Sequence, residues 1–179
     1  KPSRSRPVAV TFVTAGKTAA FMGQPIGEVL SLKLLWATVG GQVFDIQAEN
    51  KDIDLPTLQN IHKHKTGMLM RAAVRMGAIA AGATDRQLDD MTGYAEDIGL
   101  AFQIADDVLN VTGTREELGK NPNTDAERGK KTYPTFYGVD GAKKLADDCV
   151  ARAITRLSSF GPSADPLREI ARYITSRKN

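Results

Sequence analysis

The most informative stretch of the chain is Gly99-Leu-Ala-Phe-Gln-Ile-Ala-Asp-Asp-Val-Leu-Asn110, which sets two adjacent carboxylates into an apolar helical pattern. Helical spacing puts four polar side chains on one stripe, at positions i, i+3, i+4 and i+7: Gln103, Asp106, Asp107 and Asn110. Carboxylates on a helix that buries itself are costly unless a cation meets them. Mg²⁺ accepts a few carboxylate oxygens and keeps its other positions for water and phosphate. The stripe therefore predicts a magnesium site, with a solvated acidic face as the simpler alternative.

The composition around this stretch favours a single all-α domain. The 179 residues are 41% hydrophobic and 25% charged but only 6% aromatic, with few alternating runs that would indicate strands. A net charge of +3 is too small to indicate a nucleic-acid partner. No apolar run reaches the roughly 20 residues that a membrane span needs. Cys149 is the only cysteine, which excludes a disulfide framework and favours the reducing cytoplasm.

Apolar periodicity and capping residues predict a succession of helices. We expect them over residues 8–22, 28–49, 57–64, 66–82, 86–111, 141–159 and 166–177, with a further helix opening at Tyr133-Pro134. The helix over 86–111 contains Gly93 and Gly99, and a kink is expected at one of them. Residues 112–131 are rich in Gly, Asn, Pro and charge, so we expect a long loop of the kind that is usually functional or disordered.

Three further clusters combine charge and small residues in patterns suited to phosphate. They are the polar helix positions Gln42, Asp45 and Glu49; the run His62-Lys-His-Lys-Thr-Gly67; and the lysine–glycine segments 118–121 and 129–134. Each alone is also compatible with a solvent face, a basic helix end or an exposed loop. Together, a carboxylate-bound metal and separate lysines are what a diphosphate requires, because the metal bridges phosphate oxygens while ammonium groups neutralise the rest.

Four blocks of the sequence match one enzyme family in order and in spacing. They are Gly40-Gly41-Gln42 with Asp45; Lys65-Thr66-Gly67; Phe102-Gln103-Ile-Ala-Asp106-Asp107-Val-Leu-Asn110; and Gly119-Lys120 followed by Gly129-Lys130-Lys131-Thr132-Tyr133-Pro134. Over about residues 40–142 the chain resembles the trans-isoprenyl diphosphate synthases, or polyprenyl synthetases, of the short-chain (farnesyl or geranylgeranyl) type. The resemblance implies an all-α isoprenoid-synthase bundle around a central cavity, incomplete in this chain, and a homodimer.

The resemblance further implies that residues 1–179 are the C-terminal portion of one prenyltransferase domain. Within it, residues 1–27 match poorly, residues 28–142 form the catalytic core, and residues 143–179 form C-terminal helices. The family's first aspartate-rich motif has no equivalent in this sequence. Lys1-Pro2-Ser3 resembles the segment directly after that motif, so we expect the motif to lie upstream of residue 1. The chain as given is then expected to be inactive by itself.

The family's metal and diphosphate ligands map onto five residues of this chain. Asp106 and Asp107 resemble the second aspartate-rich motif, which binds Mg²⁺ (with Mn²⁺ as the alternative) and through it the allylic diphosphate. Lys65, Lys120 and Lys130 resemble the lysines that contact diphosphate.

The remaining family positions are catalytic or supporting. Thr66 and Gln103 resemble residues near the reacting carbons, where their dipoles stabilise an allylic cation. The implied catalytic set is therefore Lys65, Thr66, Gln103 and Lys130, supported by Gln42, Asp45 and Asn110. Asn110 stands where many members carry a third aspartate, so one anionic ligand is missing here.

The implied activity is head-to-tail condensation of isopentenyl diphosphate with an allylic prenyl diphosphate, giving a short-chain isoprenyl diphosphate. A non-catalytic regulatory subunit of a heteromeric synthase is one alternative, and an intact first motif in the upstream coding sequence would remove most of its support. A class I terpene cyclase-like protein is another, which the lysine-rich loop and Lys65-Thr66 disfavour. A helical module with solvated charged faces is the third, and stabilisation by Mg²⁺ with a diphosphate would argue against it.

Overall fold

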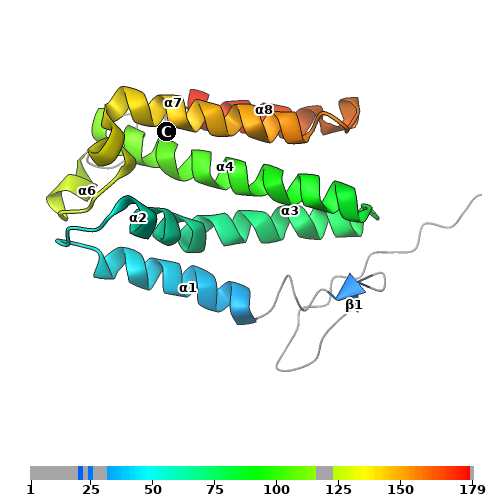
Figure 1. Cartoon of the computed structure of the whole chain (residues 1–179), viewed down its shortest axis with the longest axis horizontal. Coiled ribbons are helices and arrows are strands. Elements are labelled where there is room, and N and C mark those ends of the chain that lie inside the picture. The colour runs from blue at the N-terminus through cyan, green and yellow to red at the C-terminus, as the bar shows by residue number, and fades with distance from the viewer. Residues whose placement is uncertain (1–19, 22–23, 26–31, 116–122, 178–179) are drawn as a thin grey trace, which may run out of the picture.

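The computed structural model describes residues 20–21, 24–25, 32–115 and 123–177, with side chains placed from Gly40 onward. The described part is a stack of helices that lie side by side (Figure 1). Its elements are β1 (Ala20–Phe21), β2 (Gln24–Pro25), α1 (Leu32–Gln47), α2 (Leu55–His62), the π-helix η2 (Lys63–Gly67), α3 (Met68–Ala80), α4 (Asp85–Thr112), α6 (Thr124–Glu127), α7 (Tyr133–Arg156), the 3-10 helix η3 (Pro162–Ala164) and α8 (Asp165–Ser176). The predicted all-α class is confirmed.

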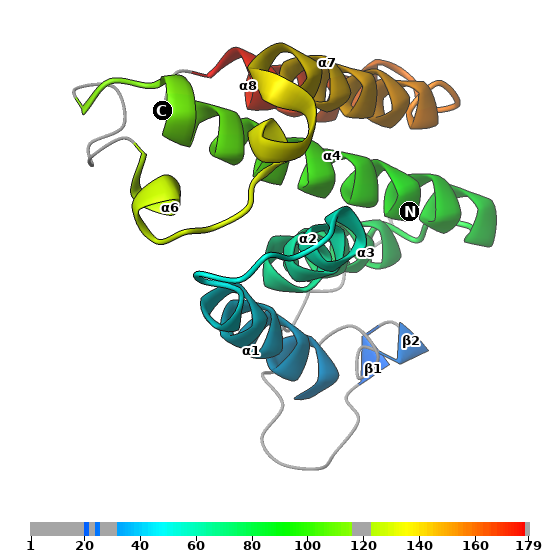
Figure 2. The ribbon, with the colours of Figure 1, turned by 60° about the vertical axis from the view of Figure 1, so that its left-hand side comes forward.

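Helix α4 runs through the middle of the stack. It packs against α7 and α8 on one side and against α3 and η2 on the other, while α1 lies outermost and contacts η2 (Figures 1 and 2). The core is centred on this helix and α7. The largest fully buried side chains are Tyr94, Ile104, Tyr133, Cys149 and Leu157. The Tyr94 hydroxyl donates a hydrogen bond to the carbonyl oxygen of Leu167 at 2.7 Å, and this bond connects α4 to α8.

A capping box starts α4, as the sequence suggests. The Thr84 hydroxyl accepts from the Gln87 amide at 3.3 Å, and the Gln87 side chain accepts from the Thr84 amide at 2.9 Å. The expected kink at Gly93 or Gly99 is wrong, because α4 is helical from Asp85 to Thr112. These glycines serve close packing instead. A Cβ on Gly93 would lie 2.6 Å from the Arg156 guanidinium carbon, and one on Gly99 would lie 3.2 Å from the Cα of Gly67.

Three other expectations from the sequence need correction. The helix over 8–22 falls mostly outside the described residues, and its described part, Ala20–Phe21, pairs as a strand with Gln24–Pro25. Helices 57–64 and 66–82 are not separate, since α2 continues through η2 into α3. The range 112–131, expected to be a long loop, contains the short helix α6 in its described part. That short helix is fixed by hydrogen bonds to α4, which local sequence does not reveal.

No helix in the described ranges combines the length and the hydrophobicity that a membrane crossing requires. Several large apolar side chains are exposed. They include Val43, Phe44 and Ile46 on α1 and Leu69 on α3.

Candidate active site

A charged cavity of about 230 Å³ lies between α1, η2, α4 and the segment from α6 to the start of α7. Its lining combines carboxylates, amides and ammonium groups from parts of the chain far apart in sequence. The lining residues are Asp45, Leu58, His62, Lys65, Thr66, Phe102, Gln103, Asp106, Asp107, Asn110, Asp125, Lys130, Lys131 and Thr132. The acidic stripe of α4 and the two lysine clusters therefore meet at one hollow.

One carboxylate oxygen holds two lysines at this cavity. Lys65 Nζ donates to Asp45 Oδ2 at 2.8 Å, and Lys130 Nζ donates to the same oxygen at 2.7 Å. Lys130 also lies 3.7 Å from a Glu49 oxygen. Burial by itself would raise the pKa of Asp45, but the two lysine hydrogen bonds outweigh it and hold that pKa below 3.8. Each ammonium has three donors, so the pair can still bind an anion in the cavity.

The π-helix η2 places Lys65 and Thr66 at the cavity, and α1 reaches it through a glycine. Gly41 is buried, and a Cβ built on it would lie 2.3 Å from the backbone nitrogen of Lys65. Only a residue without a side chain permits this contact between two backbones. The close approach brings Asp45, one helical turn after Gly41, within hydrogen-bonding distance of Lys65.

The two adjacent aspartates of α4 have different surroundings. The Asp106 side chain is 48% exposed and pairs with the guanidinium of Arg177, which also lies 4.2 Å above the centre of the Phe102 ring. Asp107 is only 8% exposed, and its Oδ2 accepts from the backbone N–H of Tyr133 at 2.9 Å, at the first residue of α7. Asp106 is thus accessible to a ligand, whereas Asp107 fastens α7 to α4.

Burial also shifts the pKa values of two groups that line the cavity. It raises the pKa of Asp107 to about 7 and lowers the pKa of His62 to about 4, with the charge of Lys65 adding to the shift of His62. His62 Nε2 and Asp107 Oδ1 are 3.9 Å apart. At neutral pH His62 is uncharged, so this contact is not an ion pair.

Most of the predicted site residues come together in the structure. The cavity is lined by the predicted residues Lys65, Thr66, Gln103, Lys130, Asp106, Asp107, Asp45 and Asn110. Gln42 is exposed and is not among the lining residues. Lys120 lies outside the described residues.

Three residues at or beside the cavity were missed by the sequence prediction of the site. Asp125 lies in the segment that was expected to be a loop. His62 belongs to the cluster 62–67, from which only Lys65 and Thr66 were predicted as site residues. Arg177 pairs with a residue 71 positions earlier. No sequence signal gives that pairing, because it depends on how α8 packs along α4.

The donor set is suited to a magnesium ion shared with phosphate. Within the described residues there is no group of three or more His, Cys, Asp or Glu side chains arranged to hold a metal by themselves. Mg²⁺, however, is usually held by one or two carboxylates together with substrate phosphates and water. Asp106, half exposed at a cavity with two lysines, fits that mode of binding.

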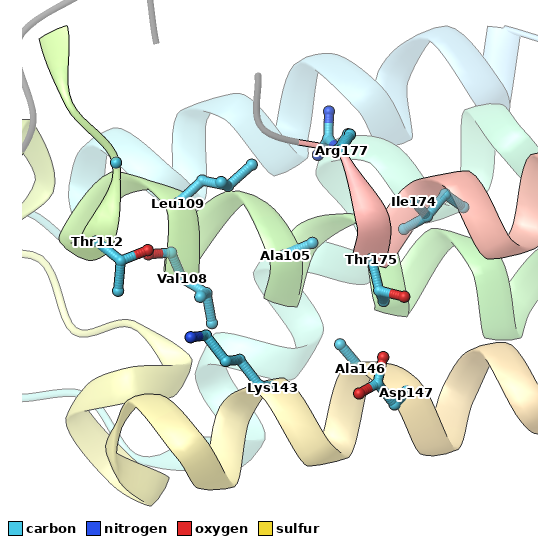
Figure 3. Close-up of a pocket in the computed structure, with 11 residues that line it drawn as sticks. Ala105, Val108, Leu109, Thr112, Lys143, Ala146, Asp147, Ile174, Thr175 and Arg177 are labelled. Atoms are coloured by element: carbon cyan, nitrogen blue, oxygen red, sulfur yellow. The ribbon is translucent and has the colours of Figure 1, made fainter. Parts of the chain in front are cut away.

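A second cavity of about 300 Å³ lies between α4, α7 and α8 (Figure 3). Val108 and Leu109 of α4 and Ile174 of α8 line it, and Lys143 and Asp147 project from α7. Arg177, the residue after α8, lines this second cavity and also pairs with Asp106, which lines the charged cavity.

Comparison with known proteins identifies the family. The polyprenyl synthetase family model matches residues 17–159. The chain is 46% identical over 142 residues to a geranylgeranyl diphosphate synthase of Cyanophora paradoxa, covering 79% of this chain and 47% of the relative. It is 41% identical over 156 residues to a farnesyl diphosphate synthase of Escherichia coli, covering 85% and 52%. The chain thus spans about half the length of the curated relatives it matches.

Solved structures agree on the fold. A farnesyl/geranylfarnesyl-type (FPP/GFPP) synthase from Zymomonas mobilis superposes with a TM-score of 0.64 at 37% identity, over 82% of this chain and 51% of the other. A heptaprenyl diphosphate synthase from Staphylococcus aureus gives a TM-score of 0.80 at 19% identity, over 86% and 60%. Sequence and structure lead to the same assignment: the chain belongs to the polyprenyl synthetase family.

Proposed function

We propose that this chain forms the diphosphate-binding part of an isoprenyl diphosphate synthase. Such an enzyme condenses isopentenyl diphosphate with an allylic prenyl diphosphate to a short-chain product. The observation that carries the proposal is the convergence of Lys65 and Lys130 on one oxygen of Asp45, at the cavity that Asp106 also lines. Relatives named as geranylgeranyl and farnesyl diphosphate synthases, at 46% and 41% identity, support the short-chain class.

The residues divide the chemistry between them. Lys65 and Lys130 bind the diphosphate and stabilise the charge that develops as it leaves. Gln103 and Thr66 direct their dipoles at the allylic cation, and the ring of Phe102 helps exclude water from it. Mg²⁺, or Mn²⁺ in its place, would be held by Asp106 with Asp107 beside it, and would neutralise phosphate charge. Gln42 and Lys120 remain proposed as a supporting residue and a diphosphate ligand.

We propose a cytoplasmic homodimer as the working form of the complete protein. A free, buried Cys149 is compatible with a reducing compartment. Residues 28–142 would supply the catalytic core, and residues 143–179 the C-terminal helices that pack on it.

The test is Mg²⁺-dependent condensation of radiolabelled isopentenyl diphosphate by the complete gene product, with dimethylallyl, geranyl and farnesyl diphosphates as primers. We expect Lys130→Gln to lower kcat/KM by about a hundredfold, because a buried donor to the leaving group is lost. Lys144→Gln, an exposed lysine of α7, is the control and should leave kcat/KM unchanged. If no primer supports incorporation by the unsubstituted protein, the proposed function is wrong.

The pairing of Arg177 with Asp106 gives a separate prediction. Arg177→Gln removes a cation that competes for the Asp106 carboxylate, so Mg²⁺ should bind about fivefold more tightly in the presence of inorganic pyrophosphate. Isothermal titration calorimetry on the chain measures this. The control is Arg172→Gln, five residues earlier and within α8, whose guanidinium pairs with the exposed Glu169. Equal Mg²⁺ affinity in Arg177→Gln and Arg172→Gln would remove Asp106 from the metal site.

A further inference from the structure

Asn110 lies at the C-terminal end of α4. It contacts α6 and its flanking residues (123–128, here called the α6 turn) through three hydrogen bonds. Its side-chain Nδ2 donates to the Thr124 hydroxyl oxygen at 2.8 Å, and its Oδ1 accepts from the Asp125 backbone N–H at 3.3 Å. Its backbone carbonyl accepts from the Asn123 N–H at 2.7 Å. The residue is 4% exposed. The buried side-chain amide of Asn110 thus uses both its donor and its acceptor to bind the α6 turn.

The α6 turn connects these contacts to the lysine of the cavity. The Asp125 carbonyl accepts from the Lys130 backbone N–H at 2.9 Å, and the Lys130 ammonium reaches Asp45 at 2.7 Å. The Arg128 carbonyl accepts from the Asn50 N–H at 3.2 Å, which anchors the turn to the segment after α1. In Figure 2, α6 lies between the C-terminal end of α4 and the region of α1. The position of Lys130 therefore depends on where α6 is held.

We propose that Asn110 is a positioning residue. Its side-chain amide holds the α6 turn against α4, a contact that we call the clasp, and so fixes the positions of Lys130 and Asp125 at the charged cavity. The proposal rests on the proposed function for the identity of the ligand. It assigns Asn110 a role other than metal binding, since Oδ1 already accepts from a backbone N–H. A carboxylate at this position offers no donor to Thr124 and adds a further negative charge beside Asp107 and Asp125.

A double-mutant cycle tests the clasp on the 179-residue chain. Asn110→Leu and Thr124→Val each remove one partner of the hydrogen bond between the two side chains and keep the side-chain size similar. Thr124→Ser keeps the hydroxyl. The first readout is hydrogen exchange at the amides of Asp125 and Lys130. The second is the dissociation constant for inorganic pyrophosphate with Mg²⁺. Thr112→Val is the matched control, because it deletes a hydroxyl that bonds within α4, to the Val108 carbonyl at 2.9 Å.

We expect Asn110→Leu and Thr124→Val each to speed exchange at both amides and to weaken pyrophosphate binding by about three- to tenfold. The double variant should be no worse than Asn110→Leu alone, because that substitution already removes the contact to Thr124, and Thr124→Ser should keep both values near those of the unsubstituted chain. Thr112→Val should change neither. Exchange and affinity that stay unchanged in Asn110→Leu would overturn the proposal, as would additive effects in the double variant.

Asn110→Asp separates the clasp from a metal ligand. If Asn110 binds metal, the added charge should tighten Mg²⁺ binding, and that result would overturn the proposal; the clasp predicts no gain. Failure of the proposed function looks different. In that case the unsubstituted chain does not bind pyrophosphate with Mg²⁺, while hydrogen exchange at Asp125 and Lys130 still decides whether Asn110 holds the turn.

Discussion

Gly41→Ala is expected to lower the free energy of unfolding by about 3 kcal/mol or more, at the upper end of overpacking effects. The new Cβ would lie 2.3 Å from the backbone nitrogen of Lys65 and 2.5 Å from the carbonyl carbon of His64. Neither atom can rotate away as a side chain would, so α1 must separate from η2. Since Asp45 follows on the same helix, the separation should also weaken its hold on Lys65.

Gly40→Ala is the matched control, one residue earlier on α1. No described atom beyond its own helix and chain neighbours lies within 4 Å of the Cβ position. Alanine is favoured over glycine in a helix interior by about 1 kcal/mol, so this variant should be more stable than the unsubstituted chain. Urea denaturation of both variants measures the two effects. Equal stability of the two would show that α1 and η2 do not meet at Gly41.

Asp45→Asn is expected to cost about 3 kcal/mol of stability, the low end of the range for breaking a buried ion pair. The amide cannot neutralise Lys65 and Lys130, and the Lys130 side chain is only 11% exposed. The two ammonium groups would then repel each other, and the Lys130 side chain would have little access to water. Asp52→Asn is the control. It also removes a carboxylate that pairs with a lysine, since Asp52 Oδ1 lies 3.2 Å from Lys131 Nζ, but the Asp52 side chain is 92% exposed. It should have an effect near zero.

The pH dependence of Asp45→Asn provides an independent check. A carboxylate whose pKa is lower in the folded than in the unfolded state stabilises the fold above the unfolded value of 3.8. That contribution is lost as the pH falls through the lowered pKa. The difference in stability between Asp45→Asn and the unsubstituted chain should therefore be constant at neutral pH and shrink below about pH 4. A difference that persists unchanged into strong acid would mean that Asp45 does not act through its charge.

Much of the fold was predictable because local signals mark it. The Thr84 cap, Pro56 near the start of α2 and the apolar period of residues 66–82 give most of α2, α3 and α4 within a few residues. The polar stripe of α4 was visible for the same reason, since helical spacing alone puts Gln103 and Asp106 on one face.

The rest of the site depends on contacts between residues that are far apart in the sequence. Lys130 meets Asp45 across 85 residues, and Asp107 meets Tyr133 across 26. The helix α6 forms where composition indicated a loop, because the side chain and the backbone carbonyl of Asn110 hold it. Neither propensity nor periodicity contains such information. Likewise, the spacing of Asp106 and Asp107 does not show that both line the cavity while only Asp107 is buried and accepts a hydrogen bond from the first residue of α7.

The shared oxygen of Asp45 bears on which anions the cavity can select. An incoming anion must compete with a carboxylate that already lies between Lys65 and Lys130. Chloride or a single phosphate, with few charges and few oxygens, gains little by such an exchange. A diphosphate can engage both ammonium groups at once and retain oxygens for a metal ion, so we expect the resident carboxylate to favour polyvalent over monovalent ligands.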